Sequence, residues 1–522
     1  MKGFLYFVKS VAVFLFFVTL ADAKDLRLRL TSDPVTLDWN LARSSHETHI
    51  IMNFMEGLVE VGQDLNPIPA LALKWEISSD NKIYTFHIRP NVVWSDGKKL
   101  SASDFKNSWL RLLDPKSKSN YANFLFDIEN AEEFYKGKIK NPDQVGIRAK
   151  SDLLLEVRLK NPVHYFLYLP SFWVTFPIRL DVIKKYGKNW FLPGHVVTLG
   201  PYLLDGWEKN KFILLKKNSL YYRSEVFNAN TPEKVTFMIE PDDQKARTLF
   251  EQSKVDVFLD ATTQDLINKN PKTKILQFPY LATYYLGFQV GVGPIKDLDV
   301  RKAIACSIDT HQIPSILQGG QIEATGWIPQ ELLAELQGNR MPLNCTLFDA
   351  KASLSKAGYP EGKGFPVLNL FIEKFDGASL LAQEIQKSLK EKLGIKIQTQ
   401  ITTQTKFLKA TRSNQAGLFI THWGADFPDP ANFFELFLSD NNANLTFWKK
   451  QEYDQKVKAA RQTLQQKERF VLFDEAEKIL IQKEFVILPL FYRKNTVLVH
   501  DHIKSFSVTP LNYLFFKNVV LN

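Results

Sequence analysis

Hydrophobic and polar residues alternate in several short segments, and we predict a β-strand at each of them. Leu26–Leu30 alternates leucine with arginine, and Ile83–Arg89 and Ile395–Ile401 also place apolar residues at every second position. This period of two is typical of strands with one buried face. The apolar runs Gly417–Ile420 and Val486–Leu490 are predicted to be buried strands.

Other segments repeat their apolar residues at helical spacing. Leu381, Ile385, Leu389 and Leu393 recur every four residues, and Gly394 follows them as a helix cap. A long helical stretch is predicted over Tyr453–Gln482. Strands and helices therefore alternate along the chain, which indicates an α/β protein.

The length of 522 residues exceeds what one hydrophobic core usually holds, so two or three domains are expected. We find no internal repeat and no flexible linker, and therefore expect the domains to share strands. The net charge of +10 is not concentrated in any dense basic run, so a nucleic-acid partner is not predicted.

The N-terminus has the three parts of a cleavable signal peptide. Lys2 and Lys9 precede the apolar run Ser10–Leu20, which ends at Ala21-Asp22-Ala23. The run is shorter than the roughly 20 residues that span a bilayer. We expect residues 1–23 to be removed and the mature chain to be periplasmic. No cysteine stands at the cleavage point, so a lipid anchor is not predicted.

The sequence contains two cysteines, Cys306 and Cys345. An oxidising compartment allows them to form a disulfide, and two free buried thiols fit the sequence at least as well.

The stretch Thr421–Pro430 combines residues that could hold a positive charge away from water. Asp426 offers acceptor oxygens, Trp423 a wall, and Gly424 room for another backbone to approach. The alternative is a capped turn between a strand and a helix, because Asp and Pro are common turn residues. By itself the stretch favours the turn.

No motif in the sequence indicates catalysis or a cofactor. Gly358–Gly364 is one residue short of a phosphate-binding loop and lacks the following Ser or Thr. Asp426 and Asp429 could be an acid/base pair as in a glycosidase, but no second motif supports this. His46 and His49 lack the spacing of a zinc helix and are interpreted as surface residues. We therefore predict neither an enzyme nor a metal site.

Several segments, taken in order, resemble one known family. The longest is PALALKWEISSDNKIYTFHIRPNVVWSDGKKLSASDFKNSWLRLLDP, at residues 69–115. Further matches are the segments around Gly200-Pro201-Tyr202, Asn218–Tyr222, Val300–Ile304 and Ala357–Pro360. This series resembles the extracytoplasmic oligopeptide- and dipeptide-binding proteins of ABC importers, the family 5 solute-binding proteins. The resemblance covers nearly all of the mature chain.

The resemblance implies a two-lobed periplasmic-binding-protein fold of type II, with a hinge and an extra third domain. By this resemblance the first lobe takes residues 24–57, 176–285 and 488–522. The extra domain takes residues 58–175, and the second lobe takes residues 286–487.

The resemblance also implies ligand-binding positions. Asp426 matches the aspartate that receives the α-ammonium of a bound peptide, and deleting such a carboxylate strands a buried charge. The other implied positions contact the backbone, side chains or carboxylate of the ligand: Arg43, Ser44, Ser45, Tyr121, Asp260, Arg412, Trp423 and Gly424. A structural role for Asp260 and a solvated surface role for Arg412 fit equally well. Some oligopeptide binders have a cysteine where this chain has Gly424, so the disulfide of the family is not expected here.

The implied function is capture of short peptides and their delivery to an ABC permease in the inner membrane, by a monomer without chemistry of its own. Within the same fold the cargo could instead be a nickel chelate, haem, an opine or an oligosaccharide. A periplasmic chaperone or adhesin that exposes the same cleft is the alternative of another class.

Overall fold

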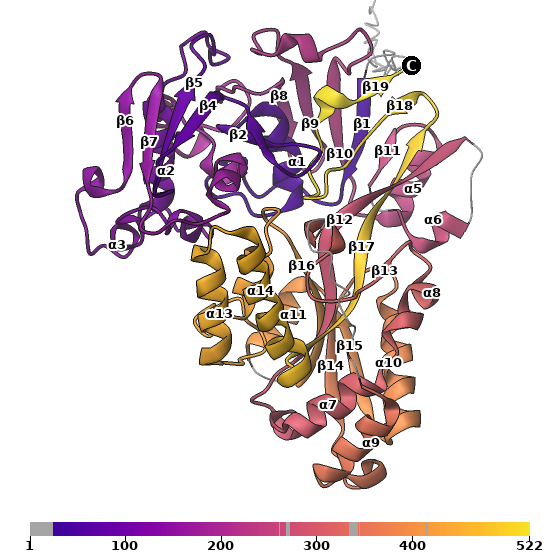
Figure 1. The fold of residues 1–522 in the computed structure, drawn as a ribbon. Coiled ribbons are helices and arrows are strands. Elements are labelled where there is room, and N and C mark those ends of the chain that lie inside the picture. The colour runs from indigo at the N-terminus through magenta and orange to yellow at the C-terminus, as the bar shows by residue number, and fades with distance from the viewer. Residues whose placement is uncertain (1–24, 260, 268–271, 334–342, 344, 414–415) are drawn as a thin grey trace, which may run out of the picture.

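A large mixed β-sheet runs through the centre of the molecule (Figure 1). This computed structural model describes residues 25–522 except 260, 268–271, 334–342, 344 and 414–415. The strands lie side by side in the order β15 (Ile397–Thr402), β14 (Leu368–Glu373), β16 (Leu418–Gly424), β12 (Thr273–Phe288), β17 (Ile487–His500), β11 (Val257–Phe258), β1 (Asp25–Leu30), β10 (Lys234–Ile239), β9 (Phe212–Lys217) and β8 (Tyr202–Glu208), with β13 (Ile322–Glu323) also on β17.

Two long strands connect the two ends of this sheet. The first half of β12 pairs with the second half of β17, which also pairs with β11. The second half of β12 pairs with β16 and with the first half of β17. Between these halves the β12–β17 register shifts, from Pro279 to Thr283. Such irregularities bend a strand pair, so this point is suited to act as a hinge.

The sheet divides at β12 and β17 into two lobes. The first lobe contains β1 and β8–β11 with α1 (Ser45–Phe54), α4 (Leu180–Tyr186), α5 (Asp243–Glu251), α6 (Thr263–Ile267) and the C-terminal pair β18 (Ile503–Ser505) and β19 (Val520–Leu521). The second lobe contains β14–β16 with α7 (Leu298–Ser307), α8 (Ile313–Leu317), α9 (Leu347–Lys356), α10 (Ala378–Leu393), α11 (Gln404–Arg412) and α12 (Ala431–Phe434). Strands and helices alternate in the second lobe as the sequence predicts.

Helix α10 shows why the predicted pattern forms a helix. Its apolar face, spaced every four residues from Leu381 to Leu393, is buried in the core of the second lobe. Gly394 ends the helix with φ at 69°, a conformation that glycine adopts without the cost of a side chain. Both predictions are confirmed.

A separate four-stranded sheet lies beside the first lobe (Figure 1, left). It consists of β4 (Ala72–Ile77), β5 (Ile83–Ile88), β7 (Leu154–Arg158) and β6 (Ile147–Ser151). Helix α2 (Ala102–Leu113) packs on β6 and β7, and α3 (Ala131–Tyr135) packs on α2. The small pair β2 (Val59–Val61) and β3 (Pro67–Pro69) precedes this sheet. We call residues 58–175, which also include β2 and β3, the extra domain. The apolar face of β5 is buried, as its alternation predicts.

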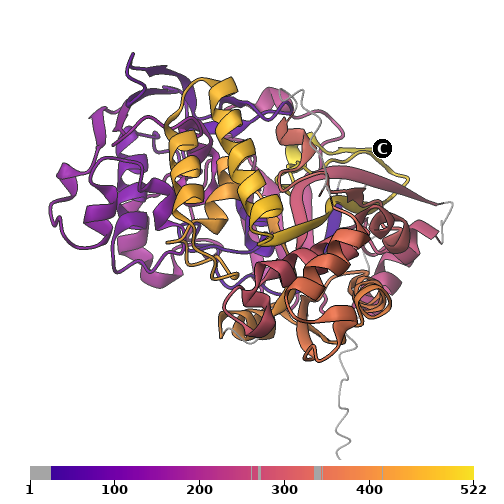
Figure 2. The ribbon, with the colours of Figure 1, turned by 60° about the horizontal axis from the view of Figure 1, so that its bottom comes forward.

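The predicted long helix after Tyr453 is wrong in one respect, because it is broken. The structure has α13 (Gln451–Gln462) and α14 (Gln466–Glu477), followed by a wider helical turn, Lys478–Lys483. The break lets the two helices pack on each other and bury Tyr453 and Phe473 together. Figures 1 and 2 show both helices beside the extra domain.

Cys306 and Cys345 form a disulfide with a Cα–Cα distance of 5.6 Å. The alternative of two free thiols is therefore wrong. Cys306 lies in α7 and Cys345 just before α9, and these helices pack side by side, which the 39-residue separation does not reveal. The interpretation of His49 as a surface residue is also wrong: it is buried, and burial lowers its pKa to about 3.

Candidate functional site

The loop that follows β16 is tied down on both sides of Asp426. Upstream, the Ala425 amide donates to the carbonyl of Leu281 on β12 at 2.8 Å. Downstream, the side-chain oxygen of Asn432 accepts from the Asp426 amide and from the Trp423 indole, each at 3.1 Å. One amide side chain therefore orients both the aspartate and the indole.

The carboxyl group of Asp426 is held in surroundings that disfavour its charge. Burial raises its pKa to about 7, against a smaller lowering by the hydrogen bond from Asn432. In the described part of the chain, no Lys, Arg or His forms an ion pair with this carboxylate. Asp426 is half-buried. A carboxylate that has lost part of its water without gaining a cation is unfavourable by itself, and a positively charged ligand group would remove that penalty.

The charge of Asp426 acts on three tyrosines that come from distant parts of the chain. Burial and the charge of Asp426 raise the pKa of Tyr121, Tyr280 and Tyr513, which come from the extra domain, β12 and the C-terminal segment. Their hydroxyl groups keep their protons at neutral pH, so they can donate or accept hydrogen bonds. We call Asp426 and these three tyrosines the acidic site.

Gly424 allows Tyr280 to lie against β16. A Cβ atom at position 424 would stand 2.6 Å from the Tyr280 hydroxyl oxygen, closer than any ordinary contact. Ala282 pairs with Gly424 across the strands, so Tyr280 crosses the strand end at the register shift of β12. The glycine therefore permits the close approach of the Tyr280 side chain.

Tyr121 is placed by an aromatic cluster of the extra domain. Its ring meets Phe124, Phe172 and Trp173 edge-on, with centroids 5.2, 5.3 and 5.5 Å away. Such edge contacts are favourable because the positive ring edge faces a negative ring face. The charge of Arg43 lowers the pKa of Tyr121, against the effects of burial and of Asp426, so Arg43 also lies near the acidic site.

The loop before α1 is held by Glu47. The backbone amides of Arg43 and Ser44 donate to one Glu47 oxygen at 2.8 and 2.6 Å, and the Ser44 hydroxyl donates to it at 2.9 Å. This hydroxyl is therefore already bound, while Arg43 and Ser45 are exposed at the start of the helix.

The structure thus brings together Asp426, Trp423, Gly424 and Tyr121, with Arg43 nearby. Arg412 is exposed at the last residue of α11, and in the described residues no contact joins it to Asp426. Asp260 lies outside the described residues. The sequence reasoning missed Tyr280, Tyr513 and Asn432, and of these only Asn432 is close to Asp426 in the sequence.

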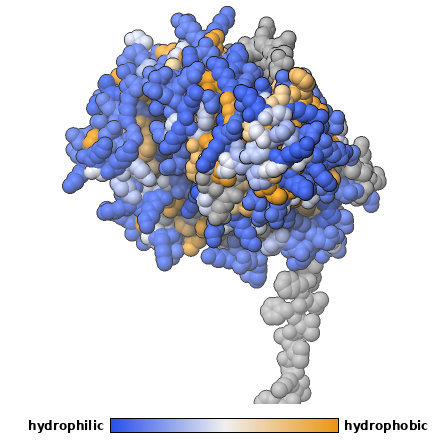
Figure 3. All heavy atoms as spheres, turned by 90° about the horizontal axis from the view of Figure 1, so that it is seen from below, coloured by the Kyte–Doolittle hydropathy of each residue, from blue (hydrophilic) through white to orange (hydrophobic). Residues whose placement is uncertain are grey.

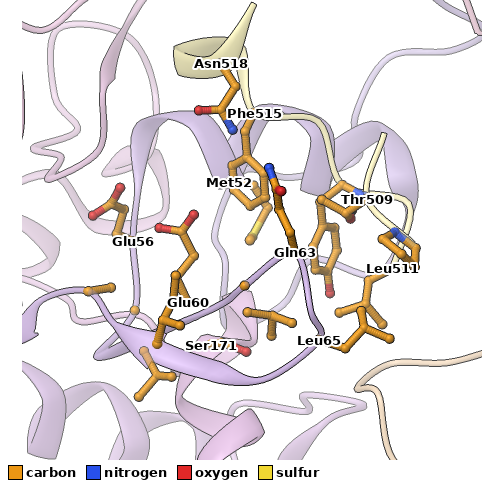
Figure 4. A pocket seen from close by; sticks show the side chains of 18 of the residues that line it. Met52, Glu56, Glu60, Gln63, Leu65, Ser171, Thr509, Leu511, Phe515 and Asn518 are labelled. Atoms are coloured by element: carbon orange, nitrogen blue, oxygen red, sulfur yellow. The ribbon is translucent and has the colours of Figure 1, made fainter. Parts of the chain in front are cut away.

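A cavity of about 410 Å³ lies among α1, β2 and the segment after β18 (Figure 4). Its walls are largely apolar, and Glu56 and Glu60 stand at one side. Both carboxylates are already matched by Arg223 and Lys517, with Glu60 2.8 and 3.0 Å from these cations. The cavity therefore offers no uncompensated charge, and none of its lining residues belongs to the second lobe.

Figure 3 shows the lower face as mostly hydrophilic, with hydrophobic residues in patches between hydrophilic ones. Among the described residues, no helix is both long enough and apolar enough to cross a membrane.

Two lobes joined by crossing strands, with an extra domain beside the first lobe, define a two-lobed periplasmic-binding-protein fold. The structure aligns with a periplasmic oligopeptide-binding protein, OppAIV of Borrelia burgdorferi, at a TM-score of 0.82 and 25% identity, over 95% of this chain and 100% of that one. The chain belongs to the bacterial extracellular solute-binding proteins, family 5, whose family model matches residues 66–444.

Two curated relatives are each 28% identical to the chain. One is the dipeptide-binding protein DppE of Bacillus subtilis, which aligns over 95% of this chain and 91% of its own. The other is a probable deoxycholate-binding periplasmic protein, YgiS of Escherichia coli, which aligns over 96% and 94%. These two relatives thus carry names that refer to quite different ligands.

Proposed function

We propose that the protein is a periplasmic solute-binding protein that captures short peptides between its lobes by their α-ammonium group. The observation that carries this proposal is Asp426, an acidic group surrounded by aromatic side chains. An ammonium group would restore the charged form of the carboxylate through a charge-assisted hydrogen bond. The names of DppE and of the Borrelia protein support a peptide as cargo.

The remaining ligand would lie extended along the end of β16, as peptides do when they add a strand to a sheet edge. The Trp423 indole would pack against one side of the peptide, and Tyr121 would contact it from the extra domain. A ligand that contacts both lobes biases the hinge toward closure. Arg43, Ser44, Ser45, Asp260 and Arg412 remain candidate contacts in this proposal.

The cellular setting completes the proposal. Residues 1–23, outside the described residues, form a signal peptide, and the mature chain works as a monomer that delivers its cargo to an inner-membrane ABC permease. The domains have the boundaries predicted from the sequence. The protein catalyses no reaction of its own, since family membership describes solute binding.

Asp426 argues against an anionic cargo. Deoxycholate carries a carboxylate, which would meet the Asp426 carboxylate as a like charge. A neutral oligosaccharide would leave the buried carboxylate without a cation. Mass spectrometry of ligand released from the purified protein distinguishes these cargoes from peptides.

Calorimetric titration of the mature chain with tri- to pentapeptides, free and N-acetylated, tests the proposal. Free peptides are expected to bind, and acetylation or Asp426→Asn is expected to weaken binding by about 100-fold or more, because the unpaired partner stays buried. Asp440→Asn, which removes an exposed carboxylate of the same lobe, is the control and should bind as the wild type does. Equal binding of free and acetylated peptides would refute amine capture.

A further inference from the structure

The loop that carries Asp426 also rests on the extra domain. Phe427, the next residue, is 5% exposed and stacks on Tyr165 with ring centroids 4.9 Å apart. Phe124 contacts the Phe427 ring edge-on, with ring centroids 6.0 Å apart. Phe427 belongs to the second lobe and both partners belong to the extra domain, so this aromatic contact crosses between them.

A guanidinium group makes a second connection across the same boundary. Arg461 of α13 donates to Asp127 at 2.8 Å and to the Tyr165 hydroxyl at 2.7 Å, and it pairs with Glu435 of its own lobe at 2.9 Å. Tyr165 in turn donates to Asp127 at 2.7 Å. Burial and the charge of Asp127 hold the pKa of Tyr165 well above its ordinary value, so the hydroxyl keeps this proton.

Asp429, three residues after Asp426, holds the other end of this loop in place through its hydrogen bonds and ion pair. Its carboxylate accepts from the Ala431 amide at 2.8 Å and pairs with the fully buried Arg469 of α14. The ring of His164, from the extra domain, lies 3.7 Å from its other oxygen. The four residues from Asp426 to Asp429 are thus held between α14 and the extra domain.

The extra domain itself is bound to the first lobe. Arg111 of α2 pairs with Asp38 and also donates to Asn40 at 2.7 Å. Asn40 donates to Ser108 at 3.1 Å, and the Trp173 indole donates to the carbonyl of Ala42 at 3.2 Å. Opening the lobes about β12 and β17 would therefore carry the extra domain with the first lobe and separate it from α13.

We propose that Asp127, Tyr165, Phe427, Glu435 and Arg461 form an interdomain clamp that positions Asp426 and favours the closed arrangement of the lobes. The inference rests on the proposed peptide-binding function and adds a role for the extra domain. The clamp residues act through the loop and do not touch the peptide. Opening exposes Phe427 and strands Asp127 without its cation, so part of the drive for closure is present before the ligand arrives.

The experiment measures closure and peptide affinity separately in the mature chain. Spin labels at Lys138→Cys in the extra domain and Lys458→Cys on α13 occupy exposed positions, and the native cysteines are paired. Double electron–electron resonance then reports the distance between the two labels, with and without a tripeptide. The clamp variants are Asp127→Asn and Tyr165→Phe, the latter removing a single hydroxyl.

Both variants are expected to lengthen the distance in the free protein and to weaken tripeptide binding about tenfold, mainly through faster dissociation. Combining Asp127→Asn with Arg461→Met should weaken binding no more than the stronger single variant, because the two residues share one interaction. Asp143→Asn breaks an ion pair with Lys106 inside the extra domain and is the matched control.

Unchanged distances and affinities in both clamp variants would overturn the inference, and so would full additivity of Asp127→Asn and Arg461→Met. Failure of the proposed function looks different: the wild type would bind no tripeptide at all. The distance in the free protein would still show whether the clamp holds the lobes together.

Discussion

At the scale of single residues, the pKa of Asp426 depends on whether a ligand is bound at the acidic site. Burial raises this pKa to about 7 in the free protein. An ammonium group beside the carboxylate favours the charged form and lowers the pKa again. Binding and protonation are therefore linked, and the linkage has a definite sign.

Peptide affinity is expected to fall as the pH drops below 7. There Asp426 is protonated in the free protein and must lose its proton before it can pair with the ammonium group. With a pKa of about 7 for Asp426, the association constant should decrease by up to tenfold for each pH unit below 7. At pH 5 it should be roughly 100-fold below its value for the fully ionised carboxylate. Above about pH 8 the peptide amine loses its own proton and affinity should fall again.

Titration calorimetry between pH 5 and 9 measures both limbs. Asp426→Asn serves as the control, because without the carboxyl group the acidic limb should disappear. A wild-type affinity that stays constant from pH 5 to 7 would contradict the assigned role of Asp426.

Gly424→Ala is expected to destabilise the protein by about 0.5–1.5 kcal/mol, the cost of pushing the Tyr280 side chain away from its preferred rotamer. The added Cβ would lie 2.6 Å from the Tyr280 hydroxyl oxygen and 3.2 Å from the ring carbon that bears it. Tyr280→Phe removes the closer atom, so the double variant should recover part of the loss. Urea unfolding of the two single variants and the double variant gives these free energies. If Gly424→Ala alone costs nothing, Tyr280 does not lie where the structure places it.

The sequence could indicate only the part of the candidate site that is contiguous in the chain. Asp426, Trp423 and Gly424 stand within four residues, so their chemistry is visible as a short stretch. Tyr280 and Tyr513, on which the charge of Asp426 also acts, come from β12 and from the segment after β18. Their convergence follows from the crossing of β12 and β17, which local periodicity does not encode.

At the scale of elements, the strands and helices with a clear apolar period were predictable, and the breaks between them were not. Helix α10 and strand β5 bury the faces that their spacing indicates. The stretch after Tyr453 keeps helical spacing through a break, because α13 and α14 fold back on each other and both present apolar residues to one core. The choice between one helix and two depends on this tertiary contact.

The disulfide between α7 and the start of α9 is expected to stabilise the second lobe by about 3–4 kcal/mol. It closes a loop with a sequence separation of 39 residues, and the loss of freedom in the unfolded chain gives a free energy of this size. Urea unfolding of the oxidised protein, the reduced protein and the Cys306→Ser/Cys345→Ser variant measures it. The reduced protein and the double variant should agree, and a midpoint insensitive to reductant would speak against the pairing.

At the scale of the whole molecule, the lobes and the extra domain are distinct bodies with a shared interior. One hydrophobic cluster contains Leu26 of the first lobe, Phe86 of the extra domain and Phe433 of the second lobe. A second cluster fills the far part of the second lobe. The neighbours Tyr284 and Tyr285 on β12 belong to different clusters, so this strand contributes side chains to both hydrophobic clusters.

Because both clusters depend on β12, we expect the lobes to lose their structure in a single unfolding transition that peptide shifts as a whole. Tryptophan fluorescence reports on Trp109 in the extra domain and on Trp327 beside the second lobe, both fully buried, and far-ultraviolet circular dichroism reports on the backbone. The two signals should share one midpoint in urea.

A tripeptide at about 100 times its dissociation constant should raise the free energy of unfolding by about 2.7 kcal/mol, since it binds only the folded chain. Asp426→Asn should show the single transition without this increase. Two separate transitions, with peptide moving only one, would mean that the crossing strands join the lobes without making them one cooperative unit.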